Sequence, residues 1–348
     1  MHRAIALFSG GLDSQLAVKL MVDQGVEVEC LTAVSVFHQG GPDVDENHPT
    51  AQAARRLGAS ITFINTSADL FDMVKNPRHG LGSRMNPCLD CRIFLLRKAR
   101  DRMAEAGAEF VVTGEVLGQR PMSQRRHTMK QVVREAGLGG LVLRPLCAKR
   151  LSPTAPEERG WVDRDRLLGL TGRSRKPQMR LAEELGIADY PSPAGGCLLT
   201  DPGFAFRLRE LLDHRDADVD DVALLRVGRH FRLDDRTKAI VARDEAECHE
   251  LESLARDGDT LLQATEFTGP TTLLRGETSE DNLRTAARLT AAYGKGKAEP
   301  VVTVAVRRVG EDEAEQVAAP AADDDEVRDR MITRNKPAHS HEARSVMK

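Results

Sequence analysis

The chain has few aromatic side chains and no long apolar run. Its 348 residues include one Trp, two Tyr and ten Phe, so a core has to be built mainly from Leu, Val and Ala. No apolar stretch approaches the roughly 20 residues that cross a membrane, and the run in "MHRAIALFSGG" is too short for a signal peptide. A formal net charge of −3 excludes a chain that is basic throughout. We therefore expect a soluble cytoplasmic protein, long enough for two domains.

Strand and helix signals alternate over the first 115 residues. The predicted strands are 3–8, 26–37, 59–67 and 108–115, and the predicted helices between them are 13–24, 48–58 and 91–107. This alternation predicts an α/β fold with a doubly wound parallel sheet and helices on both faces. Ligands of such sheets bind beyond the carboxyl ends of the strands, near the point where the strand order reverses. We therefore expect the loops at 9–14 and 113–115 to meet at one site.

Changes in composition divide the chain into three parts. Pro and Gly are dense from 191 to 203, which places the end of an N-terminal catalytic domain, 1–203, in that stretch. Residues 204–310 are predicted to form a smaller α+β domain. Residues 311–348 are acidic and alanine-rich at first and show no apolar periodicity, so we expect a disordered tail there.

The first predicted strand ends in "SGGLDS", residues 9–14. Two interpretations are open: a tight strand-to-helix turn, which glycines permit, and a loop that binds phosphate. In the second, backbone N–H groups approach the phosphate oxygens and the following helix adds its dipole. Ser9 and Ser14 would then donate hydrogen bonds, and Asp13 would hold a Mg²⁺ that bridges phosphates. The Gly-Lys-Ser/Thr ending of a Walker A loop is absent, which argues against a γ-phosphate-transferring ATPase of the P-loop class.

The segment "LFSGGLDS" resembles the PP-loop of the ATP pyrophosphatases, and "VVTGEVLGQRPMSQ" is similar to the TGE-x-LGQ-x-x-SQ stretch of 4-thiouridine tRNA synthetases. The resemblance covers about residues 3–200. It implies an adenine nucleotide α-hydrolase-like fold that cleaves ATP between the α- and β-phosphates and adenylates an oxygen. The nucleotide contacts that it implies are Phe8, Ser9, Gly10, Gly11, Asp13, Ser14, Arg92, Gly114 and Gln124. That family's THUMP region has no counterpart before residue 9, and its rhodanese domain is not recognisable.

Six cysteines in a cytosolic chain favour metal or redox chemistry over disulfides. Three of them, Cys30, Cys147 and Cys248, are predicted to be structural. Cys88 and Cys91 lie just before or at the start of a helix, whose dipole is expected to lower their pKa values, and Cys197 follows two glycines. Three interpretations are open: half of a zinc site, a redox or persulfide pair, and three thiolates that bind a [4Fe–4S] cluster with one iron open.

The family context favours the cluster. The layout resembles 2-thiouridine tRNA sulfurtransferases, with their "NP-x-x-x-C" loop, and the three-cysteine iron–sulfur tRNA thiolases. It implies that Cys88, Cys91 and Cys197 ligate the cluster, and that with Asp13 they are the catalytic residues. An open iron would pass sulfide to an activated carbon, with sulfide or a cysteine desulfurase as donor. The sequence does not decide whether the chain forms a homodimer.

Basic residues cluster within 119–180, in "QRPMSQRRHTMKQVVR", "LRPLCAKR" and "GRSRKPQMR". Solvated helix faces are one explanation, and contact with RNA phosphates is the other. The stretch "LLRVGRHFRLDDRTKAIVARDEAE" also resembles, weakly, the RNA-binding domain of NFACT-type proteins. Its candidate phosphate contacts are Arg226, Arg229, His230, Arg232 and Lys238.

The sequence therefore predicts an ATP-dependent tRNA thiolase that uses ATP, Mg²⁺ and a [4Fe–4S] cluster. It would form 4-thiouridine or 2-thiouridine and release AMP and pyrophosphate. The alternatives are a PP-loop ligase or amidase acting on a small molecule, and a non-catalytic module that binds a nucleotide or zinc.

Overall fold

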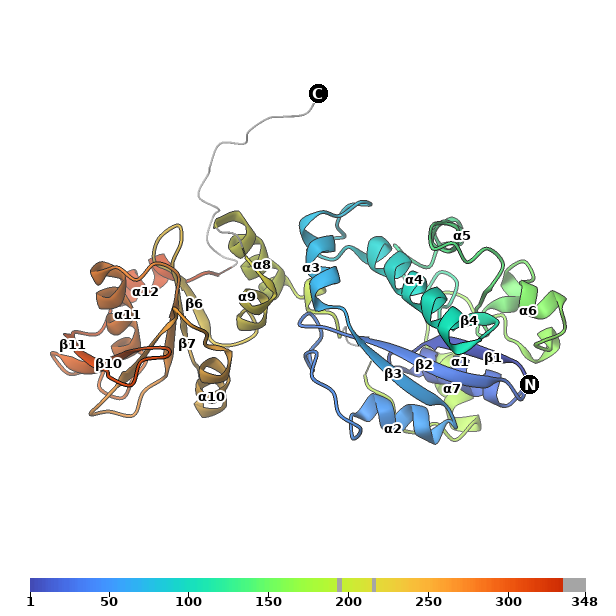
Figure 1. The fold of residues 1–348 in the computed structure, drawn as a ribbon, viewed down its shortest axis with the longest axis horizontal. Helices are drawn as coiled ribbons and strands as arrows, with labels where there is room; N and C mark the ends of the chain where they lie inside the picture. The colour runs from blue at the N-terminus through green and yellow to red at the C-terminus, as the bar shows by residue number, and fades with distance from the viewer. Residues whose placement is uncertain (193–195, 215–216, 334–348) are drawn as a thin grey trace, which may run out of the picture. The chain divides into compact units, whose positions relative to one another are not determined.

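The chain folds into two compact units that divide after Leu198 (Figure 1). The structure is a computed structural model and describes residues 1–192, 196–214 and 217–333. Cys88, Cys91 and Cys197 all lie in the first unit. No helix in the described ranges is long and apolar enough to cross a membrane.

The first unit is built on a five-stranded sheet in the order β3-β2-β1-β4-β5, and every neighbouring pair is parallel. Its strands are β1 (Arg3–Leu7), β2 (Glu27–Val34), β3 (Ser60–Asn65), β4 (Phe110–Thr113) and β5 (Val142–Leu143). Its helices are α1 (Leu12–Val22), α2 (Pro49–Arg56), α3 (Ser67–Lys75), α4 (Cys88–Ala106), α5 (Arg126–Glu135), α6 (Ala155–Glu158) and α7 (Lys176–Glu184). The predicted doubly wound α/β sheet is confirmed.

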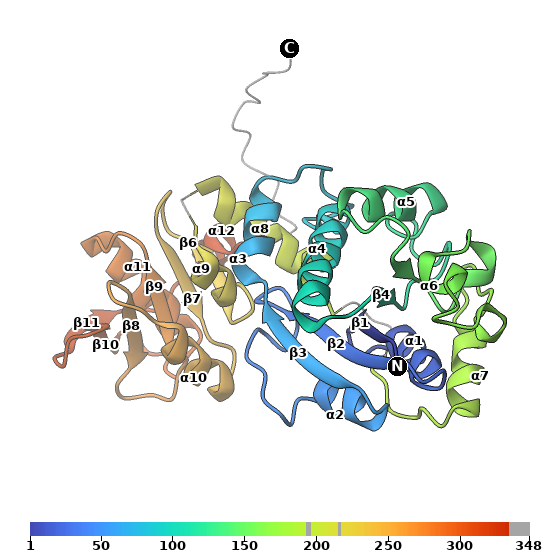
Figure 2. The ribbon, with the colours of Figure 1, turned by 45° about the vertical axis from the view of Figure 1, so that its right-hand side comes forward.

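Alternate residues of β1 enter two different cores. Ala4 and Ala6 pack with α1 and α2 in one core, and Ile5 packs with α4 and α5 in the other. Figures 1 and 2 show the corresponding layers, with α1, α2 and α7 on one side of the sheet and α3, α4 and α5 on the other. Because both faces are covered, β1 is apolar at every position except its first, Arg3, as is typical of a buried parallel strand.

The strand order reverses between β1 and β4. From β1 the chain moves outward through β2 to β3, and then crosses to the other side of β1 to form β4 and β5. Loops that leave the carboxyl ends of β1 and β4 therefore diverge around a crevice, which is the usual ligand site of such sheets. The 9–14 loop follows β1, and residues 114–115 follow β4.

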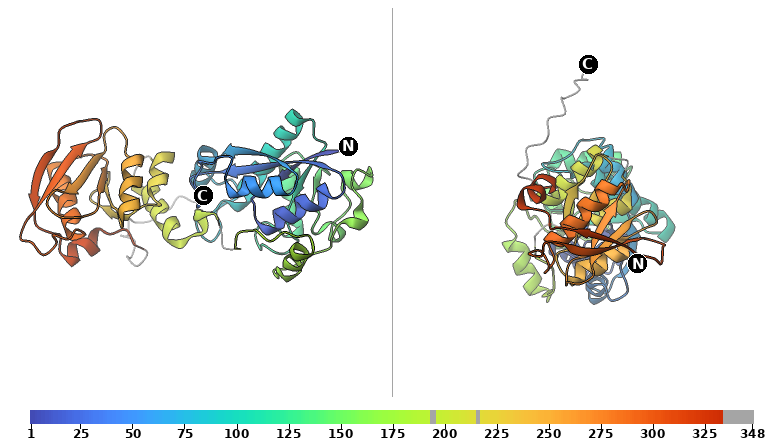
Figure 3. Two further views of the ribbon diagram at one scale, coloured as in Figure 1. Left: turned by 90° about the horizontal axis from the view of Figure 1, so that it is seen from below. Right: turned by 90° about the vertical axis from the view of Figure 1, so that its left-hand side faces the viewer.

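The second unit, coloured from yellow to red in Figure 3, contains an antiparallel sheet in the order β11-β10-β8-β9-β7-β6. Its strands are β6 (Arg229–Arg232), β7 (Lys238–Val241), β8 (Thr260–Ala264), β9 (Thr272–Arg275), β10 (Val302–Arg308) and β11 (Glu315–Ala319). Its helices are α8 (Pro202–His214), α9 (Val219–Leu224), α10 (Glu245–Leu254), α11 (Glu280–Ala292) and α12 (Asp324–Arg330). The side chains of α11 pack on one face of the sheet, and those of α9 and α10 pack on the other.

The predicted disordered tail is wrong for residues 315–330. Strand β11 pairs with β10 along its length, and α12 begins at the cap Asp323, whose carboxylate accepts from the N–H of Glu326. The strand lacks an apolar pattern because it lies at the edge of the sheet, where backbone hydrogen bonds to β10 provide the pairing. Residues 334–348 lie outside the described part.

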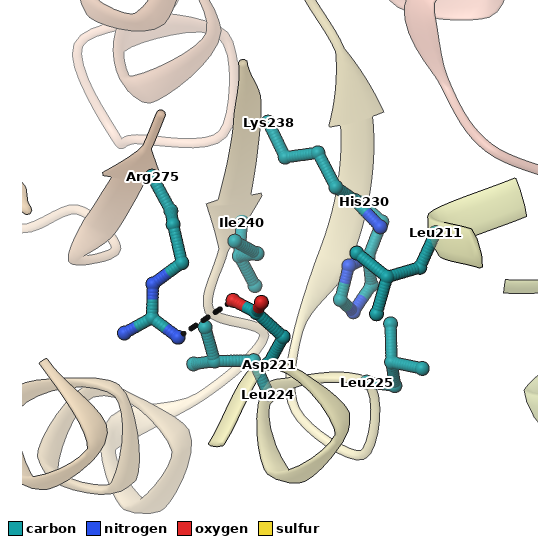
Figure 4. A pocket seen from close by; sticks show the side chains of 8 residues that line it. All are labelled: Leu211, Asp221, Leu224, Leu225, His230, Lys238, Ile240 and Arg275. Atoms are coloured by element: carbon teal, nitrogen blue, oxygen red, sulfur yellow. Dashed lines mark hydrogen bonds and ion pairs between the residues drawn. The ribbon is translucent and has the colours of Figure 1, made fainter. Parts of the chain in front are cut away.

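A buried ion-pair network holds β8 and β9 to α9. Arg275 is 3% exposed, and its Nε donates to Asp259 Oδ1 at 2.9 Å. Its Nη1 donates to Asp221 Oδ1 at 3.2 Å, the contact drawn in Figure 4. Both carboxylates are also 3% exposed, so the arginine is their counter-charge in the interior.

Arg275→Leu should destabilise the second unit by about 3–5 kcal/mol, because it removes the buried ion-pair partner that the Asp259 and Asp221 carboxylates share, although Arg256 Nη2 still lies 3.4 Å from Asp221 Oδ1. Hydrogen–deuterium exchange of β8 and β9 peptides in the full chain measures the loss. The matched control is Arg284→Leu, which removes an exposed ion pair with Glu280 on α11 and should cost less than about 1 kcal/mol. Equal protection in the two variants would contradict the prediction.

Candidate functional site

The loop after β1 is held by its own polar groups. Ser14 Oγ donates to the carbonyl of Gly11 at 2.8 Å and lies 3.4 Å from Ser9 Oγ. Gly10 has a φ of 71°, which residues with a side chain rarely adopt. Gly11 is the N-cap of α1 and provides no side-chain cap, so the amides of the first turn are left to bind an anion.

The loop after β4 lies against the main chain of this first loop. A Cβ on Gly114 would lie 2.6 Å from the carbonyl carbon of Asp13 and 2.7 Å from the nitrogen of Ser14. Cβ atoms do not approach backbone atoms so closely, so only glycine fits at this position. The predicted meeting of loops 9–14 and 113–115 is therefore confirmed, at the level of their backbones.

Asp13 presents one carboxylate oxygen that has no partner in the described part of the chain. It lies in the first turn of α1, where the helix dipole favours a negative charge. Its Oδ2 accepts from Gln119 Nε2 at 2.7 Å, whereas Oδ1 is buried and accepts no hydrogen bond. Because an unpaired buried carboxylate oxygen is unfavourable, Oδ1 suits a cation or a donor from a bound ligand.

Glu115 connects the loop after β4 to the helix that carries two of the cysteines. It is 3% exposed. Its Oε1 lies 3.2 Å from Nε of Arg92, which follows Cys91 on α4, and its Oε2 accepts from Arg144 Nε at 2.8 Å. Burial raises the pKa of Glu115, but the charges of Arg92 and Arg144 outweigh it and hold that pKa below its usual value.

Cys88, Cys91 and Cys197 come from two segments of the first unit and act on one another. Cys88 is the first residue of α4, and Asn86 Nδ2 donates to its Sγ at 3.0 Å. Cys197 forms an antiparallel bridge with His38, in the loop that follows β2. Negative charge on Cys88 or Cys197 would act to raise the pKa of Cys91.

Desolvation raises the pKa of Cys91 to about 12, although Arg92 acts to lower it. The expectation that the helix N-terminus lowers the pKa of this thiol is therefore wrong. A cysteine buried away from water pays a desolvation penalty in its thiolate form that exceeds the stabilisation by the helix dipole.

Three thiols form a soft donor set that suits zinc or an iron–sulfur cluster. Among the described residues, however, no three His, Cys, Asp or Glu side chains are at the spacing of an assembled metal site. The cysteines thus fit a soft metal group by their chemistry, and the described residues do not form an assembled site for one.

Two of the expected nucleotide contacts, Phe8 and Gln124, are buried and bond to the protein itself. The side chain of Phe8 is 3% exposed in the core, and its N–H and carbonyl both bond to β2. Gln124 is 4% exposed, and its Oε1 accepts from the N–H of Arg120 at 3.0 Å, which closes the 116–124 turn.

In the second unit, the prediction of phosphate contacts is wrong for His230 and Lys238. They are 3% and 4% exposed, because strands β6 and β7 direct them into the unit, where they line a small cavity (Figure 4). Lys238 Nζ lies 3.1 Å from Glu210 Oε2, and burial lowers the pKa of this lysine to about 8. Arg229 is only partly buried, and its guanidinium lies 4.6 Å from the centre of the half-buried Tyr293 ring.

Four residues near the site received no role from the sequence: Glu115, Gln119, Arg144 and Gln178. Glu115 and Gln119 lie within the quoted stretch "VVTGEVLGQRPMSQ", which could have indicated them. Arg144 directly follows β5, at the carboxyl edge of the sheet. Gln178 is one polar residue of a charged helix, and nothing in the sequence pattern distinguishes it.

Two segments of the chain match known families. Residues 1–150 match the family described as "Thiamine biosynthesis protein (ThiI)", and residues 228–331 match the family described as "NFACT protein RNA binding domain".

The relatives of this chain include two proteins named tRNA-specific 2-thiouridylase MnmA. The one from Magnetococcus marinus is 30% identical over 136 residues, which are 35% of this chain and 38% of that protein. The one from Pseudomonas aeruginosa is 26% identical over 243 residues, 67% of this chain and 61% of that protein. The chain thus spans less than two thirds of the length of these relatives.

Similar solved structures include a 4-thiouridine synthetase–RNA complex with bound ATP, at 19% identity and a TM-score of 0.38 over 64% of this chain and 52% of that one. Another is the U34-tRNA thiolase NcsA from Methanococcus maripaludis with its [4Fe–4S] cluster, at 16% identity and a TM-score of 0.29 over 56% and 60%.

The order of the strands, the loop after β1 and the family matches agree with the resemblances seen in the sequence. Residues 1–150 are similar to the ThiI family, and residues 228–331 are similar to the NFACT RNA-binding domain family.

Proposed function

We propose that this chain thiolates uridine in tRNA, with ATP to activate a carbonyl oxygen of the base and three cysteines to deliver the sulfur. The observation that carries the proposal is the link through Glu115, which joins the loop beside the PP-loop to the helix that bears Cys88 and Cys91. A nucleotide site and a thiol site thereby share one edge of the sheet.

The activation step uses the loops that meet at Gly114. The uridine carbonyl oxygen attacks the α-phosphorus of ATP, pyrophosphate leaves, and the base carries AMP on that oxygen. The first-turn amides of α1 and the hydroxyls of Ser9 and Ser14 bind the phosphates and stabilise the charge that develops on them. Arg92, held through its Nε by Glu115, adds a positive charge at the same edge.

Asp13 would hold the Mg²⁺ that accompanies ATP, because its Oδ1 is buried without a partner. When bound, the ion neutralises phosphate charge and favours the departure of pyrophosphate.

In the second step sulfide attacks the activated carbon and AMP leaves with the former carbonyl oxygen. Cys88, Cys91 and Cys197 would be the ligands of a [4Fe–4S] cluster, which when bound would supply a site for sulfur beside the activated base. Sulfide itself or a cysteine desulfurase would supply the sulfur. Residues 228–331 would bind the tRNA, as the family description of that segment suggests.

The position of the sulfur is the finer part of the proposal. The stretch "VVTGEVLGQRPMSQ" resembles enzymes that form 4-thiouridine, whereas the relatives above are named 2-thiouridylases. Mass spectrometry of nucleosides from treated tRNA separates the two products.

Gly114→Ala should weaken ATP binding by roughly tenfold or more, the equivalent of about 1–3 kcal/mol of steric misfit. The added methyl group would displace the backbone of Asp13 and Ser14. Equilibrium binding of a fluorescent ATP analogue measures this change. The control is Gly139→Ala, where an added Cβ meets no atom within 4 Å and binding should match that of the wild type. Unaltered binding in Gly114→Ala would refute the nucleotide site.

Cys88→Ser, Cys91→Ser and Cys197→Ser should each abolish thiolation while tRNA-dependent release of pyrophosphate persists, because the thiols act after activation. The matched control is Cys248→Ser in the second unit, which should thiolate normally. Anaerobic purification followed by iron and acid-labile sulfide analysis should give a cluster in the wild type and none in the three variants. A colourless, zinc-loaded wild-type protein, or full thiolation by Cys197→Ala, would overturn this assignment.

Binding of tRNA should weaken steeply as salt rises, because basic side chains that contact phosphates release counterions. Fluorescence anisotropy at several salt concentrations measures the slope. A chain that releases pyrophosphate with a small-molecule substrate and has no affinity for tRNA would instead be a PP-loop ligase or amidase.

A further inference from the structure

Two side-chain amides, the partly buried Gln119 and the buried Gln178, link Asp13 to the helix α7. Gln119 Nε2 donates to Asp13 Oδ2 at 2.7 Å, and Gln178 Nε2 donates to Gln119 Oε1 at 3.2 Å. Gln178 is 1% exposed, although it belongs to the basic run "GRSRKPQMR". This residue therefore faces the PP-loop and not the solvent.

The backbone holds the start of α7 beside the loop that carries Gln119. Leu117 and Thr171 form a parallel bridge, and the N–H of Gly172 donates to the carbonyl of Leu117 at 2.8 Å. Residues of α7 also contact α1, the helix that begins with the PP-loop residues. The position of Gln178 is thus fixed by main-chain contacts that do not involve its side chain.

Three buried polar atoms at this place lack a partner in the described part of the chain. They are Asp13 Oδ1, Gln178 Oε1 and Nε of Arg175, the residue that caps α7. Buried polar groups are normally hydrogen-bonded, so three unpaired atoms on two segments, the first turn of α1 and the start of α7, point to a ligand. The two oxygens suit a cation or its bound water, and the guanidinium N–H suits a phosphate oxygen.

We propose that Gln178, acting through Gln119, is a positioning residue that orients the Asp13 carboxylate for the metal-bound triphosphate, a role that rests on the proposed function. Gln119 uses its only N–H₂ group on Asp13 and its carbonyl on Gln178. This relay of hydrogen bonds, from Gln178 through Gln119 to Asp13, therefore fixes which oxygen of Asp13 remains open. It also makes α7 a wall of the nucleotide site.

The donor-to-acceptor direction of the hydrogen bonds in the relay can be tested by substitution. Gln178→Glu cannot donate to Gln119, so either orientation of the Gln119 amide sets two oxygens against each other. Partners that orient a metal ligand typically contribute about 10- to 100-fold in affinity, and we expect a loss of that size in the binding of a fluorescent ATP analogue with Mg²⁺. Binding of the same analogue in EDTA should change little. Met179→Glu adds the same charge at an exposed position of α7 and should bind as the wild type does.

A double-mutant cycle separates positioning from a general structural effect. Gln178→Leu should weaken Mg²⁺-dependent binding in the wild-type background and add no further loss in the Gln119→Leu background, because its effect passes through Gln119. Circular dichroism verifies that each variant is folded, and Gln178→Leu maintains the test if Gln178→Glu does not fold.

The outcomes distinguish the inference from the proposed function. Equal losses with Mg²⁺ and in EDTA, or additive losses in the cycle, would overturn the role of Gln178 while tRNA thiolation by the wild type still stands. A wild-type chain that binds ATP with full Mg²⁺ dependence but never thiolates tRNA would refute the proposed function and leave the relay supported.

Discussion

The pairing of Glu115 with Arg92 and Arg144 is the constraint on which the site of the first unit depends. One carboxylate at the carboxyl end of β4 holds a guanidinium from α4 and another from the end of β5. Because Arg92 directly follows Cys91, the ion pair also fixes the start of the helix that bears two thiols. The positions of Cys88 and Cys91 are therefore tied to a residue of the loop after β4.

Burial has opposite consequences for two neighbouring groups of this site. The Glu115 carboxyl is deeply buried and still has a lowered pKa, because two arginines contact it directly. The Cys91 thiol is desolvated as well, but it has one nearby arginine and two other thiols, and its pKa rises to about 12. Burial raises the pKa of both groups, and only at Glu115 do the neighbouring charges outweigh it.

Strong local patterns were sufficient to predict the sheet and its loops, since β1 and β4 are short apolar runs that end in glycine motifs. Prediction from the sequence failed where contacts with residues distant in the chain determine the structure. Strand β11 is held by backbone pairing at a sheet edge, which leaves no side-chain pattern to detect. Lys238 is buried because Glu210, 28 positions earlier, neutralises it. Gln178 contacts Gln119 only because the chain brings α7 back to the first loop.

The contact at Gly114 also limits how this site can vary in sequence. The atoms that exclude a Cβ there belong to the main chain of Asp13 and Ser14, and every amino acid has these atoms in common. No replacement of Asp13 or Ser14 can therefore make room for a side chain at position 114. A substitution at Gly114 has no compensating partner at the contact itself, and only a shift of the whole backbone of the loop would accommodate it.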